Sequence, residues 1–296
     1  MGEAVLEVID PGALTTIQDL GRRGYAHLGV PRSGALDEPA LRLGNRVVGN
    51  HEGAPALETT LTGVRLQTRS SLRVAVTGAF CRVRVQGRDV AWGSAVSVPA
   101  GAVLDIGRAE RGLRSYVSFA GGVLAEAVLG SCSTDVLSGL GPPPLRTGDR
   151  LHLGAAPAAP PSVEVPGGTP GSVLRLDLGP RQDWFTPASV AALEGATCVV
   201  GAASNRIGLR LRGQPLERAR SGELPTEPMV LGAVQVPPNG QPVVFLHDHP
   251  TTGGYPVVGV VRSEDLAVCA QARPGDRLTL RVLAAGRATP GRRPRS

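Results

Sequence analysis

Short apolar runs separated by glycine and proline constrain this chain more than any other sequence feature. The 296 residues include 40 glycines and 26 prolines, without a collagen-like period. The runs between them are too short for helices and are typical of strands. In the first half they are Val5–Ile9, Val64–Gln67, Leu72–Val76, Arg82–Val85, Ala95–Val98, Val103–Ile106 and Ser115–Phe119. In the second half they are Val173–Leu178, Cys198–Val200, Val243–His247, Val257–Val261 and Arg277–Val282. The sequence therefore predicts a mainly β protein with mostly antiparallel strands.

Two segments carry helix signals instead. Asp37–Val48 has apolar residues at helical spacing and stops at Gly49, a residue that commonly ends a helix. In Thr186–Leu193 a threonine can cap the first turn, a proline follows it, and a glycine comes after the end. We expect a few short helices beside the strands.

A stretch rich in proline, alanine and glycine divides the chain. Because prolines at this density continue neither a central strand nor a helix, residues 156–171 are predicted to connect two β-rich domains, residues 1–155 and 172–285. Residues 286–296 carry four arginines and no acid, and we expect a disordered tail there. RTGDRLHL, from Arg146, recurs as RPGDRLTL, from Arg273. Two explanations of this repeat stay open: an internal duplication, or a common type of turn that arose twice.

The basic residues exclude several chemistries. All 31 are arginine, so this chain cannot form a lysine Schiff base, anchor pyridoxal phosphate, carry biotin or complete a P-loop. Any ATP-dependent or biotin-dependent step would need another chain. The tail supplies most of the net charge of +6, and four Phe, two Trp and three Tyr provide few stacking surfaces. Nucleic-acid binding is therefore not expected.

Metal, thiol and membrane signatures are weak. Cys81, Cys132, Cys198 and Cys269 are far apart and form no Cys-x-x-Cys pair. His247 and His249 share one face of a strand, but no third ligand lies near them in sequence, so no metal site is predicted. No nucleophile elbow, signal peptide or membrane-spanning run is present. We expect a cytoplasmic protein with reduced thiols and no membrane association.

The first candidate site is the segment Asp10–Gly34, which is dense in polar groups and glycines. Glycines let a backbone approach a ligand closely, and Arg22 or Arg23 can hold a carboxylate or phosphate through two hydrogen bonds. The same density also suits an irregular surface loop that satisfies its own backbone, and the two readings stay open. The candidate residues are Thr15, Thr16, Gln18, Asp19, Arg22 and Ser33.

Two further candidate segments lie in the second half. Ser204, Asn205 and Arg206 can present a hydroxyl, an amide and a guanidinium from one turn, although a structural arginine is as good a reading. Farther on, polar groups gather at strand ends, where tight turns can expose backbone N–H groups as an anion nest. The candidates there are Glu227, Gln235, Asp248, Thr251, Thr252, Gly253, Gly254 and Tyr255.

These segments resemble the biotin-dependent carboxyltransferase family, also called allophanate hydrolase subunit 2, whose members include KipA and the C subunit of 5-oxoprolinase. The resemblance runs nearly end to end. The first half carries it in DPGALTTIQDLGRRGY at 10–25, GVPRSGALD at 29–37, LRLGNRVVGN at 41–50, ALETTLTG at 56–63, FAGG at 119–122 and GSCSTD at 130–135. The second half carries it in SNRIGLRL at 204–211, LGAVQVPPNGQP at 231–242 and TTGGYP at 251–256.

The resemblance implies a fold and partners. The fold would be two cyclophilin-like β-barrel domains with a few short helices. The chain would pair with a KipI-like chain, which is the B subunit in 5-oxoprolinases, and with the A subunit of such an enzyme. It would take a small amide or lactam substrate and would not be active alone. ATP would be bound by or shared with the partners, and biotin would come only on a partner chain.

The resemblance also implies a function and site roles. The leading reading is the C subunit of an ATP-dependent 5-oxoprolinase, which opens 5-oxoproline to glutamate. Alternatives are carboxyl transfer from carboxybiotin to urea or another amide, and a KipA-like regulatory binding protein. For lactam opening, Arg22, Arg206 and Asp248 are the catalytic candidates. Arg22, Arg206 and backbone N–H groups near Gly253 would stabilise developing negative charge. The amide would be oriented by Thr16, Gln18, Asn205 and Asp248.

The sequence departs from the family pattern at three places. Cys132 stands in GSCSTD where many relatives carry arginine, and the stretch GLGPPPLRTGD after it is altered from the usual glycine-rich form. His249-Pro250 precedes TTGGYP where a more polar pair is expected. These departures bear on the substrate more than on the fold.

Overall fold

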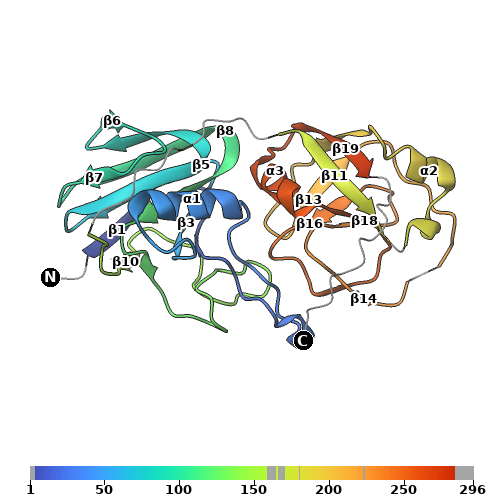
Figure 1. Ribbon diagram of the computed structural model, residues 1–296, viewed down its shortest axis with the longest axis horizontal. Coiled ribbons are helices and arrows are strands. Elements are labelled where there is room, and N and C mark those ends of the chain that lie inside the picture. The colour runs from blue at the N-terminus through green and yellow to red at the C-terminus, as the bar shows by residue number, and fades with distance from the viewer. Residues whose placement is uncertain (1–3, 159–164, 166–170, 180, 223, 284–296) are drawn as a thin grey trace, which may run out of the picture.

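The structure is a computed structural model that describes residues 4–158, 165, 171–179, 181–222 and 224–283. Two β-rich halves lie side by side, with the first half coloured blue to green and the second yellow to red (Figure 1). Most of the predicted connector, residues 156–171, and the whole predicted tail, residues 286–296, lie outside the described residues.

The first half is one ten-stranded sheet whose strand pairs are all antiparallel. Its main path runs β2-β3-β8-β4-β1-β10-β9, and β5 pairs with β6, β7 and β8. The strands are β1 (Ala4–Asp10), β2 (Thr15–Gln18), β3 (Ala56–Thr60), β4 (Val64–Thr68), β5 (Leu72–Val85), β6 (Arg88–Val90), β7 (Val96–Val98), β8 (Val103–Phe119), β9 (Val123–Leu124) and β10 (Arg150–Leu153).

Two long strands curl this sheet around its core. The predicted pairs of short strands at 72–85 and at 103–119 are each one continuous strand, β5 and β8. Register shifts after Gly78 bend β5, and the φ of +80° at Gly78 is one that few other residues adopt. A core of buried leucine, valine and isoleucine side chains, among them Leu57, Leu66 and Leu104, lies inside the curled sheet.

Helix α1 (Glu38–Val48) packs on β5 and β8 (Figure 1). The Asp37 side chain caps its first turn by accepting a hydrogen bond from the Ala40 N–H. Gly49, at φ +85°, ends it in the left-handed region, so the predicted boundaries are confirmed. A short 3-10 helix, η1 (Ala26–Leu28), lies in the loop before α1.

The second half closes into a barrel in the order β11-β18-β15-β16-β13-β12-β19. Its closing pair, β11 with β19, is parallel, whereas the other pairs of the barrel are antiparallel. The strands are β11 (Val173–Leu178), β12 (Thr197–Val200), β13 (Gly208–Arg212), β15 (Ala233–Gln235), β16 (Val243–Phe245), β18 (Val257–Val261) and β19 (Arg277–Leu283). A small separate sheet pairs β14 (Glu227–Pro228) with β17 (Thr252–Gly253).

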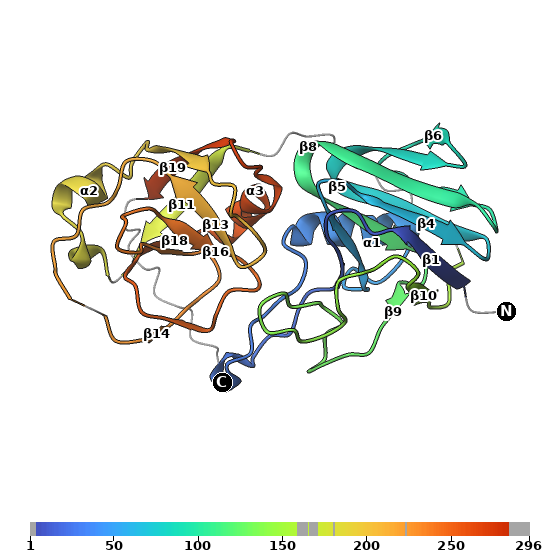
Figure 2. The ribbon, with the colours of Figure 1, turned by 180° about the vertical axis from the view of Figure 1, so that it is seen from behind.

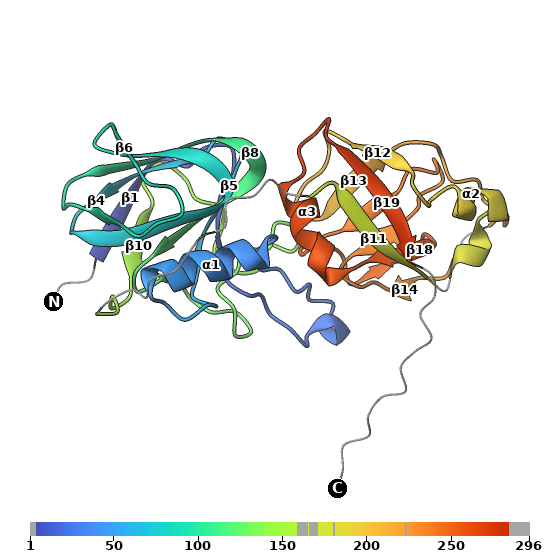
Figure 3. The ribbon, with the colours of Figure 1, turned by 45° about the horizontal axis from the view of Figure 1, so that its top comes forward.

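Short helices cover the barrel ends. Helix α2 (Pro187–Ala191) is capped by Thr186 as predicted, but it ends earlier than the predicted Leu193. Helix α3 (Leu266–Gln271), which sequence reasoning missed, faces the first half and contacts β8 (Figure 3). Two 3-10 helices, η2 (Gln182–Trp184) and η3 (Ser263–Asp265), complete the elements. The predicted class, mainly β with barrel-shaped sheets and a few short helices, is confirmed.

The repeated Gly-Asp motif folds the same way in both halves. The Arg146 N–H donates to the Asp149 carboxylate at 2.7 Å, and the Arg273 N–H donates to the Asp276 carboxylate at 2.8 Å. Gly148 and Gly275 have φ values of +90° and +93°. Each turn leads into a strand at the same sequence offset, β10 in one half and β19 in the other.

Within the described residues, no helix is long and apolar enough to cross a membrane.

Candidate functional site at the junction of the two halves

Polar groups, not only apolar ones, join the two halves. The Ser33 N–H donates to the His247 carbonyl oxygen at 3.0 Å, and the Val136 N–H donates to the Asp248 carboxylate at 3.1 Å. The segments that make these contacts are the loop from β2 to α1 and the long loop after β9. Figure 2 shows both loops between the halves, in blue and green.

Asp19 ties these two loops together. Its carboxylate accepts the backbone N–H groups of Gly21 and Cys132 and the hydroxyls of Ser131 and Ser133. A buried carboxylate with four donors is well satisfied and rigid. Asp19 therefore acts within the chain, as the anchor of the loop that carries Arg22.

Arg22 is buried, with only 2% of its surface exposed. Its guanidinium donates to the Ser33 hydroxyl at 2.7 Å and to the Ser133 and Val128 carbonyl oxygens. Ser33 then donates to the Asp135 carboxylate at 2.7 Å. All three guanidinium nitrogens of Arg22 are thus engaged inside the chain.

Arg206 bridges the two halves as the centre of a buried ion cluster. Within the second half it forms two parallel hydrogen bonds with Asp248, at 2.8 and 2.9 Å. Across the junction it pairs with Glu58 and donates to the Gly34 carbonyl oxygen. Arg206, Glu58 and Asp248 are each at most 1% exposed. One buried cation therefore neutralises carboxylates from both halves.

Electrostatics favour the charged forms of Glu58 and Arg206, whereas burial raises the pKa of Asp248. Burial would raise the pKa of Glu58, but the Arg206 and Arg114 guanidiniums outweigh it and hold that pKa below its ordinary value. Burial lowers the pKa of Arg206, but Asp248 and Glu58 together raise it above the ordinary arginine value. Tyr116, whose hydroxyl donates to Glu58 at 2.7 Å, has its pKa raised well above the usual value, first by burial and then by Glu58. Tyr116 is therefore a neutral donor to an ionised Glu58.

A second polar contact from α3 reinforces the junction. The Gln271 side chain accepts the N–H groups of Leu113 and Arg114 and donates to the Asp37 carboxylate at 2.7 Å. The Arg114 guanidinium donates to the Ala270 carbonyl oxygen. The end of α3 is thus fastened to β8 and to the cap of α1.

The remaining predicted residues of the first half lie close to this network. Thr15, Thr16 and Gln18 are buried on β2. The Gln18 side-chain amide donates to the Thr16 hydroxyl and to the Thr134 carbonyl oxygen, both at 3.0 Å. The segment that reads as an irregular loop therefore begins with a buried strand.

The other predicted residues of the second half form two separate groups. Ser204 and Asn205 make a turn before β13. The Asn205 side chain accepts the N–H groups of Ile207 and Gly208, and the Ser204 hydroxyl accepts the N–H of Arg210 in β13. The other group lies on and around the small sheet of β14 and β17 and bonds mainly to its neighbours: Glu227 pairs with Arg181 and faces Gly253, and Gln235 donates to the Tyr255 carbonyl oxygen. Thr251, Thr252 and Gly254 lie on or beside β17 in that group. The structure thus unites Arg22, Ser33, Arg206 and Asp248, but it does not unite the β14–β17 group with them.

The two histidines beside Asp248 have different surroundings. The His249 ring stacks on Phe245 with centroids 5.6 Å apart, and its Nδ1 lies 2.7 Å from the Pro250 carbonyl oxygen. His247 is 3% exposed, and its Nδ1 has no hydrogen-bond partner among the residues that the structure describes. In the described part of the chain, no group of three or more His, Cys, Asp or Glu side chains is placed to hold a metal.

A cleft of about 410 Å³ opens beside this network, between α1 and η3–α3. The first half contributes Arg23, Arg32, Glu38 and Arg42 to its walls, and the second half contributes His247, Glu264 and Leu266. Of these residues, sequence reasoning named Arg23 as an alternative to Arg22 for holding an anion and weighed His247 as a metal ligand, and it missed the others. Arg23 and Arg32 lie inside the quoted motifs, but nothing in the sequence places α3 opposite them.

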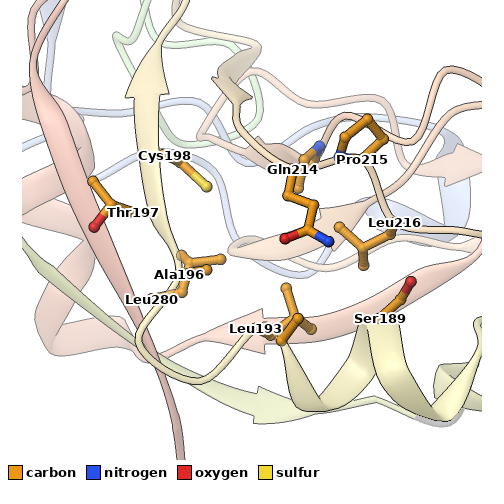
Figure 4. A pocket seen from close by; sticks show the side chains of 11 residues that line it. Ser189, Leu193, Ala196, Thr197, Cys198, Gln214, Pro215, Leu216 and Leu280 are labelled. Atoms are coloured by element: carbon orange, nitrogen blue, oxygen red, sulfur yellow. The ribbon is translucent and has the colours of Figure 1, made fainter.

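A second pocket lies in the barrel of the second half, between α2 and the strands (Figure 4). It has a volume of about 170 Å³ and is lined mainly by apolar side chains, among them Leu193, Cys198 and Leu216. None of the predicted site residues lines it. The junction is therefore the better candidate site.

Comparison with known proteins identifies the family to which this chain belongs. The sequence matches the carboxyltransferase domain, subdomain A and B, over residues 28–282. The chain belongs to this carboxyltransferase domain family. The resemblance inferred from the motifs is confirmed.

Named relatives within the carboxyltransferase domain family include two components of 5-oxoprolinases. The C subunit of 5-oxoprolinase from Escherichia coli is 39% identical over 273 residues, which cover 90% of this chain and 87% of that protein. The C subunit of 5-oxoprolinase from Haemophilus influenzae is 34% identical over 284 residues, with 92% and 89% covered. Urea amidolyase of Saccharomyces cerevisiae is 34% identical over 298 residues, which cover 92% of this chain but 16% of that protein.

Solved structures agree with this assignment. The crystal structure of TTHA0988 matches with a TM-score of 0.85 and 35% identity over 95% of this chain. The crystal structure of K. lactis urea amidolyase matches with a TM-score of 0.88 and 30% identity, again over 95% of this chain. This chain spans 55% of the TTHA0988 chain and 19% of the urea amidolyase chain.

The departures from the family pattern fit this geometry. Cys132 contributes its backbone N–H to Asp19, a contact that any residue except proline can make, and its Sγ lies 3.3 Å from the Ala125 carbonyl oxygen. His249 is accommodated by stacking on Phe245. Both substitutions therefore leave the buried network of Arg22, Arg206 and Asp248 intact.

Proposed function

We propose that this chain is the C subunit of a 5-oxoprolinase and acts in opening 5-oxoproline to glutamate. The observation that carries the proposal is the 39% identity to the C subunit of the Escherichia coli 5-oxoprolinase over 90% of this chain and 87% of that protein. In this reaction water adds to the lactam carbonyl, the C–N bond breaks, and the nitrogen takes up a proton. ATP hydrolysis drives the opening.

The composition of this chain indicates that ATP is bound by another subunit. The chain has no lysine, so it cannot complete a P-loop. We propose that the A and B subunits bind ATP and that this chain helps to hold the lactam. The protein would act in the cytoplasm and only as part of the assembled enzyme.

The burial of Arg22, Arg206 and Asp248 supports a positioning role for them. Direct contact with a substrate would require each side chain to leave a fully paired network. In their observed places they fix the loop before α1 and the turn after β16, which together border the junction cleft. Such preorganised supports matter because small displacements of reacting groups slow catalysis strongly.

Glutamate release tests the proposal. The full chain is mixed with its candidate A and B subunits, 5-oxoproline and ATP, and each component is omitted in turn. Glutamate that forms only when all three chains are present supports the function. Glutamate formation at the same rate without this chain, or none with all three, contradicts it.

A second candidate function is carboxyl transfer from carboxybiotin to urea or another amide. The family match to a carboxyltransferase domain and the TM-score of 0.88 to K. lactis urea amidolyase favour it. Its test adds urea, bicarbonate and a biotinylated partner to the same mixture. ATP consumed only in that mixture favours carboxyl transfer. If neither mixture releases glutamate or consumes ATP, the remaining candidate is a KipA-like regulator that binds a partner protein.

A further inference from the structure

The junction cleft has more arginine than its own acids neutralise. Glu38, in the first turn of α1, lies 2.5 Å from Arg32, 2.7 Å from Arg42 and 3.6 Å from Arg23. Among the described residues, the only other acid on the cleft walls is Glu264. The walls carry three guanidiniums and two carboxylates, and Arg42 also pairs with Glu52 just outside the walls. Arg23 and Arg32 therefore share Glu38 as their paired acid, and the N-terminal end of α1 adds positive potential beside them.

Two polar atoms at this cleft are buried and have no hydrogen-bond partner in the described part of the chain. One is Nδ1 of His247, a side chain 3% exposed, and the other is Nε of Arg32. Both residues line the cleft. Buried polar groups are nearly always hydrogen-bonded, so two unpaired ones on residues that line one cleft point to a ligand there. The two come from different halves, and Arg32 is close enough to His247 to lower its pKa, after the larger effect of burial.

The chemistry of the two atoms differs. Arg32 offers a permanent positive charge and an N–H donor, which suit an oxyanion. Because burial and the neighbouring guanidiniums hold the pKa of His247 well below its ordinary value, the imidazole is neutral and offers one donor and one acceptor. A ligand that satisfies both would have an anionic group at one end and an amide-like group at the other.

We propose that the junction cleft binds a small carboxylate whose anionic end is held by Arg32 and Arg23 and whose polar ring or chain end reaches His247. Naming that molecule as 5-oxoproline rests on the proposed function, since 5-oxoproline combines a carboxylate with a lactam. Leu36 and Leu266, which also line the cleft, provide an apolar floor for its ring methylenes. The volume of about 410 Å³ lies in the range of small-molecule sites.

Glu38 sets the strength of this site. It holds the three arginines in place and competes with an incoming carboxylate for them. Replacing it with glutamine keeps the size of the side chain but removes one negative charge from the cleft. The proposal therefore predicts opposite effects for Glu38→Gln and Arg32→Gln.

Calorimetric titration of the full chain tests the proposal with three probes: 5-oxoproline, L-glutamate and inorganic phosphate. We expect 5-oxoproline to bind, at least tenfold more weakly in Arg32→Gln and severalfold more tightly in Glu38→Gln. The control is Arg69→Gln, which removes an exposed arginine paired with Glu7 on β1, away from the cleft, and it is expected to bind like the original chain. Circular dichroism and thermal melting establish that each variant is folded.

Several outcomes overturn the proposal. Binding unchanged in Arg32→Gln, or not strengthened in Glu38→Gln, removes the site from this cleft. Binding of phosphate without either carboxylate overturns the carboxylate assignment. Glutamate release by the three-chain mixture with a normal KM in Arg32→Gln leaves the proposed function standing without this site. Charge-dependent carboxylate binding in a mixture that releases no glutamate supports the site and refutes the function.

Discussion

At the scale of single residues, Arg206 shows how the junction depends on exact pairing. Its guanidinium faces Asp248 from its own half and Glu58 from the other, and all three are buried. Such clusters are stable only while complete, because a buried charge that loses its partner keeps its desolvation penalty.

Replacing Arg206 with alanine is therefore expected to destabilise the fold by about 3 to 5 kcal/mol, since it leaves the buried Asp248 without an ion-pair partner and removes the nearest cation from Glu58. Urea denaturation followed by circular dichroism measures the effect. The control, Arg84→Ala, removes an arginine whose partner Asp89 is mostly exposed, and it is expected to change the unfolding midpoint little. Equal losses in the two variants would show that the cluster contributes no more than a surface ion pair.

His247 predicts a dependence of stability on pH. Burial, then Arg32 and Arg206, hold its pKa in the folded state well below the ordinary value of 6.5. Below about pH 6.5 the imidazole of His247 therefore takes up a proton in the unfolded chain but not in the folded chain. The free energy of unfolding falls as the pH drops. The slope attributable to this group is about 1.4 kcal/mol per pH unit.

Denaturant unfolding at several pH values between about 5 and 7.5 measures that slope. We expect His247→Asn to flatten it, leaving the smaller contribution of His249, whose pKa is also lowered, mainly by burial. The control is His27→Asn, at an exposed position in η1. A slope that is the same in His247→Asn and in the original chain would contradict the assignment.

At the scale of elements, the loop after β9 approaches the Arg22 network through a glycine. A Cβ on Gly141 would lie 2.2 Å from the Ser133 carbonyl oxygen and 3.2 Å from the Arg22 guanidinium. Gly139, two residues earlier, has nearly the same φ, +74° against +79°, but a Cβ there meets nothing within 4 Å. Gly139 and Gly141 thus share a similar backbone conformation but differ in the space available for a side chain.

Alanine substitutions at Gly139 and Gly141 distinguish the cost of a left-handed backbone from the cost of a steric clash. Both variants carry the penalty of a left-handed φ, about 1 kcal/mol. Gly141→Ala also pushes Ser133 from Arg22, so we expect it to lower the melting temperature several degrees further than Gly139→Ala. Differential scanning calorimetry on both variants measures the difference, and equal melting temperatures would exclude a packing role for Gly141.

The elements that could be predicted are those whose sequence pattern alone determines them. Helix α1 has both capping residues, and the runs at β1, β4, β11 and β18 are apolar enough to read. Strand β2, with the sequence TTIQ, reads as loop because its buried side chains are mostly polar. The polar groups there are satisfied by the Thr134 carbonyl and other distant partners that only the fold brings near.

The candidate site was predictable in the same limited sense. The motifs identified Arg22, Ser33, Arg206 and Asp248, which the fold does unite. They could not identify His247 and Arg32 as neighbours, since the cleft between them exists only when η3 and α3 face α1. Contacts between segments more than two hundred residues apart have no local signal.

At the scale of the whole molecule, the polar junction predicts one cooperative unit. Arg206, Gln271 and Arg114 each bridge the two halves through buried groups. Separating the halves would expose or leave unpaired all of these groups, so neither half is expected to unfold first.

Calorimetry of the full chain is therefore expected to show one transition whose calorimetric and van't Hoff enthalpies agree. The same reasoning predicts that a fragment of residues 1–155 does not fold stably, because Glu58 loses Arg206 there. Two resolved transitions, or a fragment with the sheet signal and melting behaviour of the intact first half, would show that the halves are independent.

The Gly-Asp turns bear on how freely this molecule can be rebuilt. They have matching hydrogen bonds and φ values. Each turn also exchanges two backbone hydrogen bonds with one residue of a neighbouring antiparallel strand, Val8 of β1 in the first half and Val200 of β12 in the second. The turn is thus specified by its own residues together with that strand, so Arg-x-Gly-Asp-Arg-Leu grafted into another loop is expected to keep its geometry only beside a strand that can form these bonds.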